Sequence, residues 1–467
     1  MNARRPQSRE VQVAPAQLRA LAARFPERYP ILLDSTASGV LGRYSILSAM
    51  PDAQLVLWGD GRLECRGIVL RQRDFLSALD EWWQHERIGL TSTAAPASQS
   101  GGASRQPFRG GWMIYLGYEL AARIEPGLRL PALAADSLCA LAVRVPAALV
   151  YDHVEQHCTW VVEEGVAAAD AAAALLEVQR ALDALPATRL DPPELGAMAE
   201  QDPARFEAAV LRAQEYIAQG DIYQANLSRG WQISVSAHAN AGTLYERLRI
   251  ANPAPFAAYA SLPTMTVMSS SPERLVRVCS GLVETRPIAG TRARRGTAAT
   301  DHPETQELLA NPKERAEHVM LIDLERNDLG RICTAGSVEV NEFMITESYP
   351  HLHHIVSNVR GQLRAGVTPG ATLRAVFPGG TITGCPKYRC MQIIGELEGV
   401  ARGAYTGSLG FLNVDGDMDF NILIRTATLS GGELKFRAGA GIVADSDWQR
   451  ELAETRSKAL GLMRAFV

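Results

Sequence analysis

Helical and β-type segments are mixed along this chain without the regular strand–helix alternation that builds a parallel α/β sheet. Strand-like runs occupy residues 256–262, 266–269, 275–278, 407–414 and 422–429. Long helical patterns lie elsewhere, and no repeat with a period of about 20–50 residues is present. The sequence therefore predicts a fold of the α+β class.

Two helices can be delimited from the sequence. Residues 166–185 are rich in alanine and place leucine and valine at near-helical spacing, which predicts an amphipathic helix. After a connection over 186–201, Asp202 is a suitable cap for the next helix, and Pro203 suits its first turn. Gly220 is typical of the end of that helix.

The composition is that of an ordinary globular protein: 467 residues, of which 47% are hydrophobic and 21% are charged. The net charge of −4 is unlike the clustered basic surface that binds nucleic acid, so we expect no such partner. No apolar run of about 18 residues is free of charge, so no membrane span is expected. Residues 91–107, rich in serine, alanine, glycine and proline, predict a flexible surface loop.

The seven cysteines are scattered along the chain and include no C-x-x-C pair. An odd number without close pairs argues against a disulfide framework and against a zinc site. It fits a reducing compartment, and the polar residues 1–10 do not resemble a secretory signal. We therefore expect a cytoplasmic location.

Two acidic pairs repeat the spacing E-x-x-E on predicted helices. Glu314 and Glu317 follow a helix start at Asn311-Pro312. Glu451 and Glu454 lie near the C-terminus, behind Ser446 or Asp447 as a helix cap. Residues three apart share one helix face, so two such pairs could bracket a hard cation such as Mg²⁺, which prefers oxygen ligands. The alternative is an ordinary solvated helix face, where this spacing is also common.

Two glycine-rich segments have the composition of anion-binding loops. Residues 377–387 read FPGGTITGCPK, and residues 437–445 read RAGAGIVAD. Glycines let the backbone approach an anion closely, and threonine hydroxyls add hydrogen-bond donors. Composition alone leaves the first segment as a loop with a modest tendency to bind anions.

These segments, together with KERAEH at residues 313–318, resemble the chorismate-utilising enzyme family with high specificity. The resemblance is strong over residues 202–465. It is weaker in the N-terminal part, where ILLDS at 31–35 and the stretch from GGW to GYE at 110–119 match.

The resemblance implies large antiparallel β-sheets packed as a sandwich and flanked by helices, as in anthranilate synthase component I. It also implies a β-rich N-terminal subregion, residues 1–200, that is intertwined with the core. The chorismate-binding catalytic region would then span residues 201–467.

The same resemblance assigns the acidic pairs to magnesium. Glu317 and Glu454 would be direct ligands, and Glu314 and Glu451 would act closely or through water. The ion would hold the ring carboxylate of chorismate.

The rest of the substrate site follows from the resemblance as well. Arg425 would offer a bidentate fork to the enolpyruvyl carboxylate, and Tyr405 would add a hydroxyl. For Lys458, four residues after Glu454, a substrate contact and a salt bridge to that glutamate are equal alternatives. The remaining residues of the implied substrate site are Thr381, Gly439 and Gly441.

Three further residues concern catalysis. By resemblance, Glu273 is the general acid that protonates the departing C4 hydroxyl, which near pH 7 requires a pKa raised by burial. His354 would lie beside the reacting ring. Gln224 stands where the salicylate and isochorismate synthases of this superfamily have the lysine that activates water, so ammonia is the expected nucleophile.

Ala289, in the pentapeptide PIAGT, marks a division within the family. Aminodeoxychorismate synthases usually have lysine at this position, which attacks the substrate ring, and anthranilate synthases usually have alanine. YQANL at 223–227 and FPGG at 377–380 resemble the first group. The chain therefore resembles a PIAGT-containing subclass of aminodeoxychorismate synthase component I, with anthranilate synthase component I as the alternative.

The resemblance also implies a route and a partner. A first ammonia would attack C2 to give noncovalent 2-amino-2-deoxyisochorismate, and a second would attack C4 and expel the first. No glutaminase segment of the form Gly-x-Cys-x-Gly is present, so a separate glutamine amidotransferase subunit is expected to deliver the ammonia. The product would lead to 4-aminobenzoate and folate.

The N-terminal segment Leu32–Ser35 resembles the tryptophan-binding strand of relatives. Ser35 is the expected contact in such a site, where tryptophan is either a feedback inhibitor or a structural ligand. Asp34 replaces the glutamate that is usual in anthranilate synthases.

Overall fold

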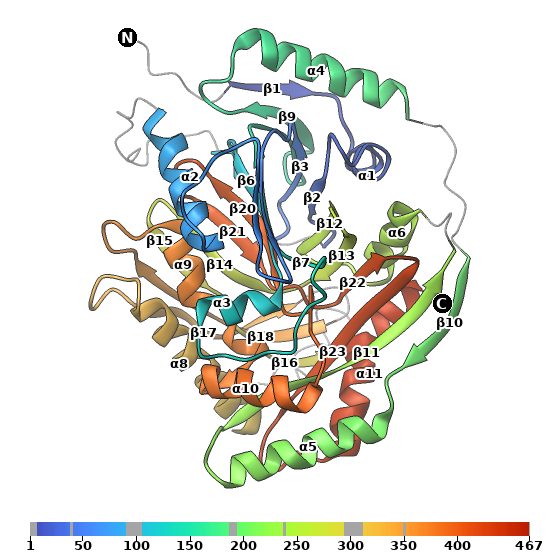
Figure 1. Ribbon diagram of the computed structural model, residues 1–467, viewed down its shortest axis with the longest axis vertical. Helices are drawn as coiled ribbons and strands as arrows, with labels where there is room; N and C mark the ends of the chain where they lie inside the picture. Colours follow the sequence, from blue (N-terminus) through green and yellow to red (C-terminus); the bar gives the residue numbers. More distant parts are fainter. Residues whose placement is uncertain are drawn as a thin grey trace.

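The computed structural model describes residues 7–37, 41–89, 105–185, 194–236, 240–293, 312–348 and 352–466. These residues form two large β-sheets with helices around them (Figure 1). Every strand pairing recorded between the named strands is antiparallel. The predicted α+β class is confirmed.

The strands of the first sheet, in spatial order, are β1 (Gln7–Val11), β9 (His157–Val162), β8 (Ala147–Asp152), β3 (Tyr44–Ala49), β2 (Ile31–Asp34), β12 (Phe256–Leu262), β13 (Met265–Ser271), β22 (Thr426–Ser430), β23 (Glu433–Ile442), β11 (Gln224–Val235) and β10 (Leu195–Glu200), and β19 (Gly384–Cys385) also pairs with β11.

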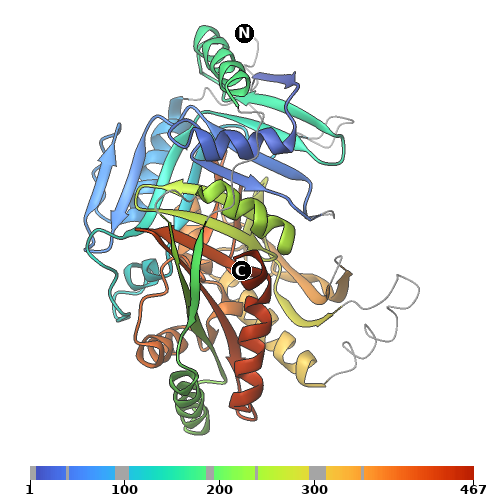
Figure 2. The ribbon, with the colours of Figure 1, turned by 90° about the vertical axis from the view of Figure 1, so that its right-hand side faces the viewer.

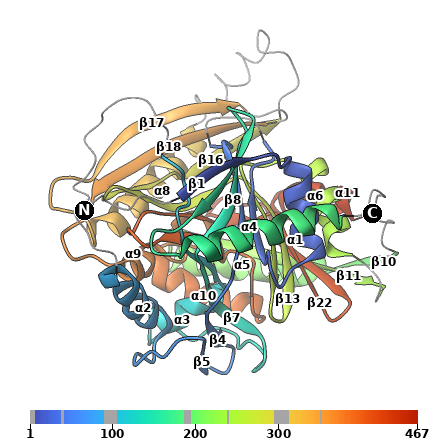
Figure 3. The same ribbon diagram turned by 90° about the horizontal axis from the view of Figure 1, so that it is seen from above.

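The strands of the second sheet, in spatial order, are β16 (Ile288–Ala293), β18 (Leu352–Gln362), β15 (Leu282–Thr285), β14 (Arg274–Cys279), β21 (Met418–Asn421), β20 (Ser408–Asn413), β6 (Gly111–Leu116), β7 (Leu138–Val145), β4 (Gln54–Trp58) and β5 (Leu63–Arg66), and β17 (Glu339–Ser348) also pairs with β18. Figure 3 shows β17 and β18 side by side at one edge of the molecule.

The helices are α1 (Pro15–Arg24), α2 (Phe75–Gly89), α3 (Ala121–Ile124), α4 (Ala168–Asp183), α5 (Pro203–Ala218), α6 (Ala241–Ala251), α8 (Pro312–Gly330), α9 (Pro369–Val376), α10 (Lys387–Glu398) and α11 (Trp448–Ala465), and two 3₁₀ turns are η1 (Tyr118–Leu120) and η2 (Gly380–Ile382).

The sheets pack face to face through one apolar layer. It combines residues such as Ile46 and Val150 of the first sheet with Met113 and Val143 of the second. Two further clusters cover the outer faces: α1, α4, α6 and α11 pack on the first sheet, and α2, α8 and α9 pack on the second. Figure 2 shows α11, in dark red, lying along β23. This is the flanked sandwich that the sequence resemblance implied.

Both sheets contain strands from either side of residue 200. In the first sheet β2 pairs with β12, and in the second β6 pairs with β20. The register of the second pair runs from Gly111 opposite Asn413 to Leu116 opposite Ser408. The predicted boundary at residue 200 lies at the end of β10, and it stays a prediction about sequence regions.

The two helices that were delimited from the sequence are present in the structure. The predicted helix at 166–185 is α4, and the helix after Asp202 is α5. Asp202 Oδ1 accepts a hydrogen bond of 3.0 Å from the Ala204 amide, and Gly220 follows the helix with φ +81°. The predicted cap of α11 is Asp447, which accepts from the Arg450 amide at 2.9 Å.

One strand prediction was wrong at its start. The run 422–429 is a strand only from Thr426, where β22 begins. Arg425 has φ +51°, a left-handed conformation that interrupts a strand. Most of the predicted loop at 91–107 lies outside the described residues.

Candidate active site

Glu273 lies between β13 and β14 and is only 5% exposed. Its carboxyl oxygen Oε1 accepts a hydrogen bond of 2.7 Å from the Thr381 hydroxyl, in η2 of the glycine-rich segment. Burial raises the pKa of Glu273 to about 7, although Thr381, Lys458 and Arg425 favour its ionised form. A carboxyl with a pKa near 7 is partly protonated at neutral pH and can act as a general acid.

Two cations face this carboxyl from other elements. Arg425 precedes β22, and Lys458 lies on α11. Burial lowers the pKa of the Arg425 guanidinium, and the charge of Glu273 opposes that effect. Lys458 Nζ also forms an ion pair of 2.7 Å with Glu454, so the salt-bridge alternative for this lysine is present, while its contact with substrate stays a prediction.

A second group of predicted residues meets where β11 begins. Gln224 is buried, and its Nε2 donates a hydrogen bond of 3.0 Å to Glu317 Oε1 on α8. Gly441 lies beside them on β23, and a Cβ there would be 2.3 Å from Gln224 Nε2 and 3.5 Å from Glu317 Oε1. Glycine at this position therefore lets the Gln224 amide pack directly against the β23 backbone while it reaches Glu317. Gln224 Oε1 is buried and has no hydrogen-bond partner among the described residues.

A third group surrounds the hydroxyl of Tyr405. A Cβ at Gly439 would lie 2.8 Å from that hydroxyl and 2.5 Å from Asn226 Oδ1. Tyr405 is buried, and burial raises its pKa to about 12, so the hydroxyl keeps its proton and can donate. Within the described chain, Asn226 Oδ1 is another buried acceptor without a hydrogen-bond partner.

The acidic residues of α11 have local partners. Glu451 Oε1 accepts from the Ser446 hydroxyl at 2.7 Å, and Glu454 pairs with Lys458. In the described part of the chain, no three His, Cys, Asp or Glu side chains form a metal-binding group. The side chain of Glu314 lies outside the described residues. The donors have the oxygen chemistry that Mg²⁺ prefers, and the magnesium site stays a prediction.

Ala289 and His354 lie on neighbouring strands. Ala289 of β16 pairs with Ile355 of β18, and Thr291 pairs with His354. The backbone therefore brings the two predicted positions close together, while their side chains lie outside the described residues.

Ser35 lies at the end of β2, outside the three groups described above. Its hydroxyl donates to the carbonyl oxygens of Tyr44 at 2.8 Å and Pro255 at 3.1 Å. The adjacent Asp34 is buried and accepts from Ser45 at 2.7 Å and from Tyr245 at 3.1 Å. This polar network is the position where the sequence predicts a tryptophan site, which stays a prediction.

The sequence interpretation missed a second buried carboxyl. Glu325, on α8, is 6% exposed, and a Cβ at Gly380 would lie 3.2 Å from its Oε1. Burial raises the pKa of Glu325 well above its ordinary value, and the charge of Asp328 adds to that effect. The sequence has no local signal for this residue, because only its burial in the folded interior distinguishes it.

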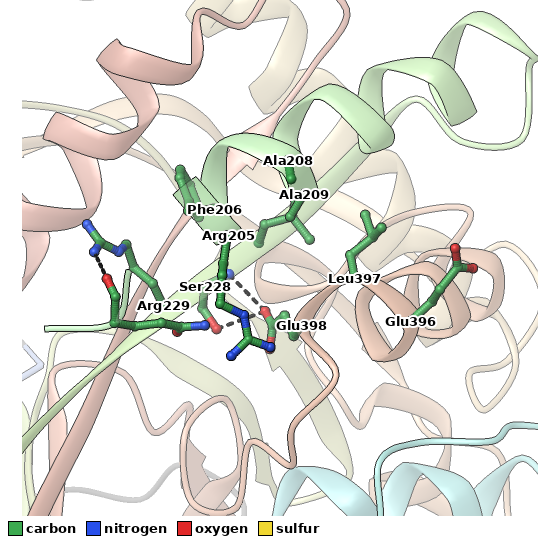
Figure 4. Close-up of a pocket in the computed structure, with 11 residues that line it drawn as sticks. Arg205, Phe206, Ala208, Ala209, Ser228, Arg229, Glu396, Leu397 and Glu398 are labelled. Atoms are coloured by element: carbon green, nitrogen blue, oxygen red, sulfur yellow. Dashed lines mark hydrogen bonds between the residues drawn. The ribbon is translucent and has the colours of Figure 1, made fainter. Parts of the chain in front are cut away.

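A surface hollow of about 310 Å³ lies between α5, β11 and the end of α10. Figure 4 shows Ser228 and Glu398 joined there, with both the amide and the hydroxyl of Ser228 donating to Glu398 Oε1 at 2.8 Å. Glu398 also pairs with Arg402 at 2.6 Å and with Arg437 at 3.1 Å. Among the described residues that line the hollow, none was predicted as a site residue.

The family assignment follows from comparison with known sequences. The family model described as "chorismate binding enzyme" matches residues 46–464, which is most of the chain. The chain therefore belongs to the chorismate-binding enzyme family, a class whose members use the fold described above.

Full-length relatives carry two different names. The chain is 40% identical to aminodeoxychorismate synthase component 1 of Bacillus subtilis, over 94% of this chain and 92% of that protein. It is 38% identical to anthranilate synthase component 1 of Thermus thermophilus, over 95% of this chain and 93% of that protein. The crystal structure of anthranilate synthase component I from Streptococcus pneumoniae matches with a TM-score of 0.75 and 31% identity, over 90% and 92%. These relatives do not decide between the two names.

No helix in the described part of the chain combines the length and the apolar character needed to cross a membrane.

Proposed function

We propose that this chain converts chorismate to 4-amino-4-deoxychorismate with ammonia supplied by a glutamine amidotransferase subunit. The observation that carries the proposal is the buried Glu273 carboxyl, hydrogen-bonded to Thr381 and faced by Arg425 and Lys458. It supplies a proton donor next to cations that suit a dicarboxylate substrate. The B. subtilis relative named for this activity supports the choice of product.

The proposed reaction has two substitution steps, and Glu273 is the proton donor in the first. Glu273 gives its proton to the C4 hydroxyl, which leaves as water while a first ammonia attacks C2. The ammonium formed at C2 returns a proton to the Glu273 carboxylate, which leaves 2-amino-2-deoxyisochorismate. A second ammonia then attacks C4, and the amine at C2 leaves as ammonia, taking up the proton that the new C4 ammonium releases. The net reaction consumes one chorismate and one ammonia and releases one water.

The buried acceptors at β11 suit this nucleophile. Gln224 Oε1 and Asn226 Oδ1 have no hydrogen-bond partners within the described residues, and unsatisfied buried acceptors favour a ligand that brings N–H or O–H donors. Gln224 is not a base that could activate water, which leaves ammonia as the preferred nucleophile. Ala289 offers no amine, so the attack at C2 must come from ammonia.

Magnesium would be held by Glu317 and Glu454, with Glu314 and Glu451 nearby. Bound there, the ion would neutralise the ring carboxylate and stabilise charge during substitution. The Gln224 amide, which donates to Glu317 Oε1 at 3.0 Å, would orient that carboxylate.

The second candidate is anthranilate synthase component I. Ala289 favours it, as do several relatives of that name. Incubation of the purified chain with chorismate, Mg²⁺ and ammonium, followed by aminodeoxychorismate lyase, separates the two. We expect 4-aminobenzoate; fluorescence of anthranilate without 4-aminobenzoate would overturn the proposal.

A further inference from the structure

The loop that carries Tyr405, residues 402–407, is held by the N-terminal half of the chain. Glu119, in η1, is 8% exposed, and its Oε1 accepts a hydrogen bond of 2.6 Å from the Arg402 amide. Its other oxygen, Oε2, accepts from the Gly403 amide at 3.1 Å. The Tyr118 amide donates back to the Gly403 carbonyl at 2.9 Å. One short segment thus satisfies three backbone groups of the loop.

Arg402 joins the same loop to the rest of the site. Its guanidinium lies 4.8 Å from the ring centre of Tyr118 and 5.5 Å from that of Tyr405. It also donates to the carbonyl oxygens of Asn226 at 2.7 Å and Ile382 at 3.3 Å. A shift of this loop would therefore disturb β11 and the glycine-rich turn as well as Tyr405.

The loop has little space to move. A Cβ at Gly407 would lie 2.3 Å from the Leu116 carbonyl oxygen, so the two segments are in direct backbone contact. Gly403 has φ +60°, in the left-handed region that favours glycine. These contacts fix where the Tyr405 hydroxyl stands relative to Gly439.

The carboxyl of Glu119 has an unusual set of partners for a buried acid. The hydrogen bonds recorded for it come from backbone amides, and burial raises its pKa to about 7. Both oxygens are used as acceptors. A glutamine would keep the shape and would turn one acceptor into a donor that faces an amide N–H.

We propose that Glu119 is a positioning residue for Tyr405, so that the N-terminal half of the chain sets the substrate contact made by the catalytic half. The inference rests on the proposed function and on the sequence prediction that the Tyr405 hydroxyl contacts chorismate. It assigns a role to the GYE segment at residues 117–119, which the proposed chemistry does not otherwise use.

The test is a double-mutant cycle on chorismate consumption with ammonium as the nitrogen source. We expect Glu119→Gln to raise KM for chorismate about tenfold, with a smaller effect on kcat, because an oriented hydrogen bond to substrate is weakened. Tyr405→Phe should have a similar effect, and the double variant should be no worse than Tyr405→Phe alone. An unchanged KM in Glu119→Gln, or effects that simply add, would overturn the proposal.

Glu163→Gln is the matched control for loss of a buried carboxylate. Glu163 is also 8% exposed, and it pairs with Arg144 at 2.5 Å, away from the Tyr405 loop. This variant should lower the melting temperature and leave KM unchanged. A rise in KM equal to that of Glu119→Gln would mean that general destabilisation explains both.

A second variant tests the same proposal if Glu119→Gln does not fold. Gly403→Ala strains the loop backbone without a steric clash, since a Cβ there meets nothing within 4 Å. Gly399, with φ +64° and the same open surroundings, ends α10 and is the matched control. KM should rise in Gly403→Ala and not in Gly399→Ala; equal values would overturn the proposal.

Failure of the proposed function would look different. Chorismate consumption is measured without reference to product, so the cycle is valid if the wild-type chain makes anthranilate. If the wild-type chain consumes no chorismate, the proposed function fails, and equilibrium dialysis of chorismate then compares the same variants by Kd. Equal Kd values for wild type and Glu119→Gln would overturn the positioning role.

Discussion

The Thr381 hydroxyl donates a 2.7 Å hydrogen bond to the buried Glu273 carboxyl, which also interacts with the charges of Arg425 and Lys458. Burial favours the protonated form of this acid, while the hydrogen bond and the cations stabilise its conjugate base. The arrangement suits a group that must give up a proton during the reaction and recover it afterwards.

Activity should therefore fall as pH rises through about 7, where Glu273 loses its proton. Thr381→Val removes a hydrogen bond that favours the carboxylate, so the pKa rises and the alkaline limb of kcat moves up by about one pH unit. Ser271→Ala is a useful control, because that hydroxyl accepts from the Glu273 amide and does not bond the carboxyl. An alkaline limb that moves to lower pH in Thr381→Val would contradict this account.

Glu273→Gln should be inactive and yet more stable than wild type at pH 8. The pKa of Glu273 rises from 4.5 to about 7 on folding, so the carboxyl costs folding free energy increasingly as pH rises between these values. The full cost above pH 7 is about 3 kcal/mol. Urea unfolding at pH 8 and pH 4 measures the difference in unfolding free energy between Glu273→Gln and wild type. The variant should be more stable at pH 8 and equally stable at pH 4.

Glu317→Ala and Glu454→Ala should each abolish turnover and the stabilisation that Mg²⁺ gives in the presence of chorismate. Loss of a carboxylate ligand weakens binding, so added Mg²⁺ no longer raises the melting temperature. Glu215→Ala, in an exposed ion pair with Arg212, is the matched control and should behave as wild type. Full activity in both metal-site variants would refute the assignment.

Ala289→Lys should introduce an amine able to attack C2. We expect intact-mass spectrometry after acid quench to show a covalent adduct equal to chorismate minus water, which the wild-type chain does not form. Ala289→Arg supplies a cation without a comparable nucleophile and should give no adduct. If Ala289→Lys also forms no adduct, residue 289 does not reach the substrate ring.

Glu398→Ala should destabilise the fold strongly. It leaves the buried Arg402 and the partly buried Arg437 without their carboxylate, and loss of a partner from a buried pair typically costs about 3–5 kcal/mol. Glu433→Ala, which breaks an exposed pair with Lys435, should cost less than about 1 kcal/mol. Urea unfolding measures the loss of unfolding free energy in each of the two variants. Similar losses in both would contradict the structural role of Glu398.

The sequence was most informative where function lies in short segments. The family motifs led to Glu273, Thr381 and Arg425, which the fold brings together from three separate elements. Helix caps such as Asp202 were also predictable, because capping depends on neighbouring residues alone.

Residues whose role depends on distant partners escaped the sequence interpretation. Glu119 bonds an amide 283 residues away, and Glu325 is notable only because a folded interior surrounds it. Neither spacing nor propensity encodes such contacts. The error at 422–425 has a local cause, since one left-handed residue, Arg425, delays the strand in an otherwise apolar run.

The pairing of β6 with β20 has a consequence for synthesis on the ribosome. Strand β6 emerges early, and its partner β20 emerges only when most of the chain has been made. The partner of β2, β12, emerges just past the middle of the chain. Until then each sheet has an unpaired edge, and long-range strand pairing is slow and exposed to aggregation. The N-terminal strands can pair with one another, as β2 does with β3 and β6 with β7. Neither half can complete its sheet alone, so one edge of β2 and one edge of β6 stay unpaired until their partners have been made.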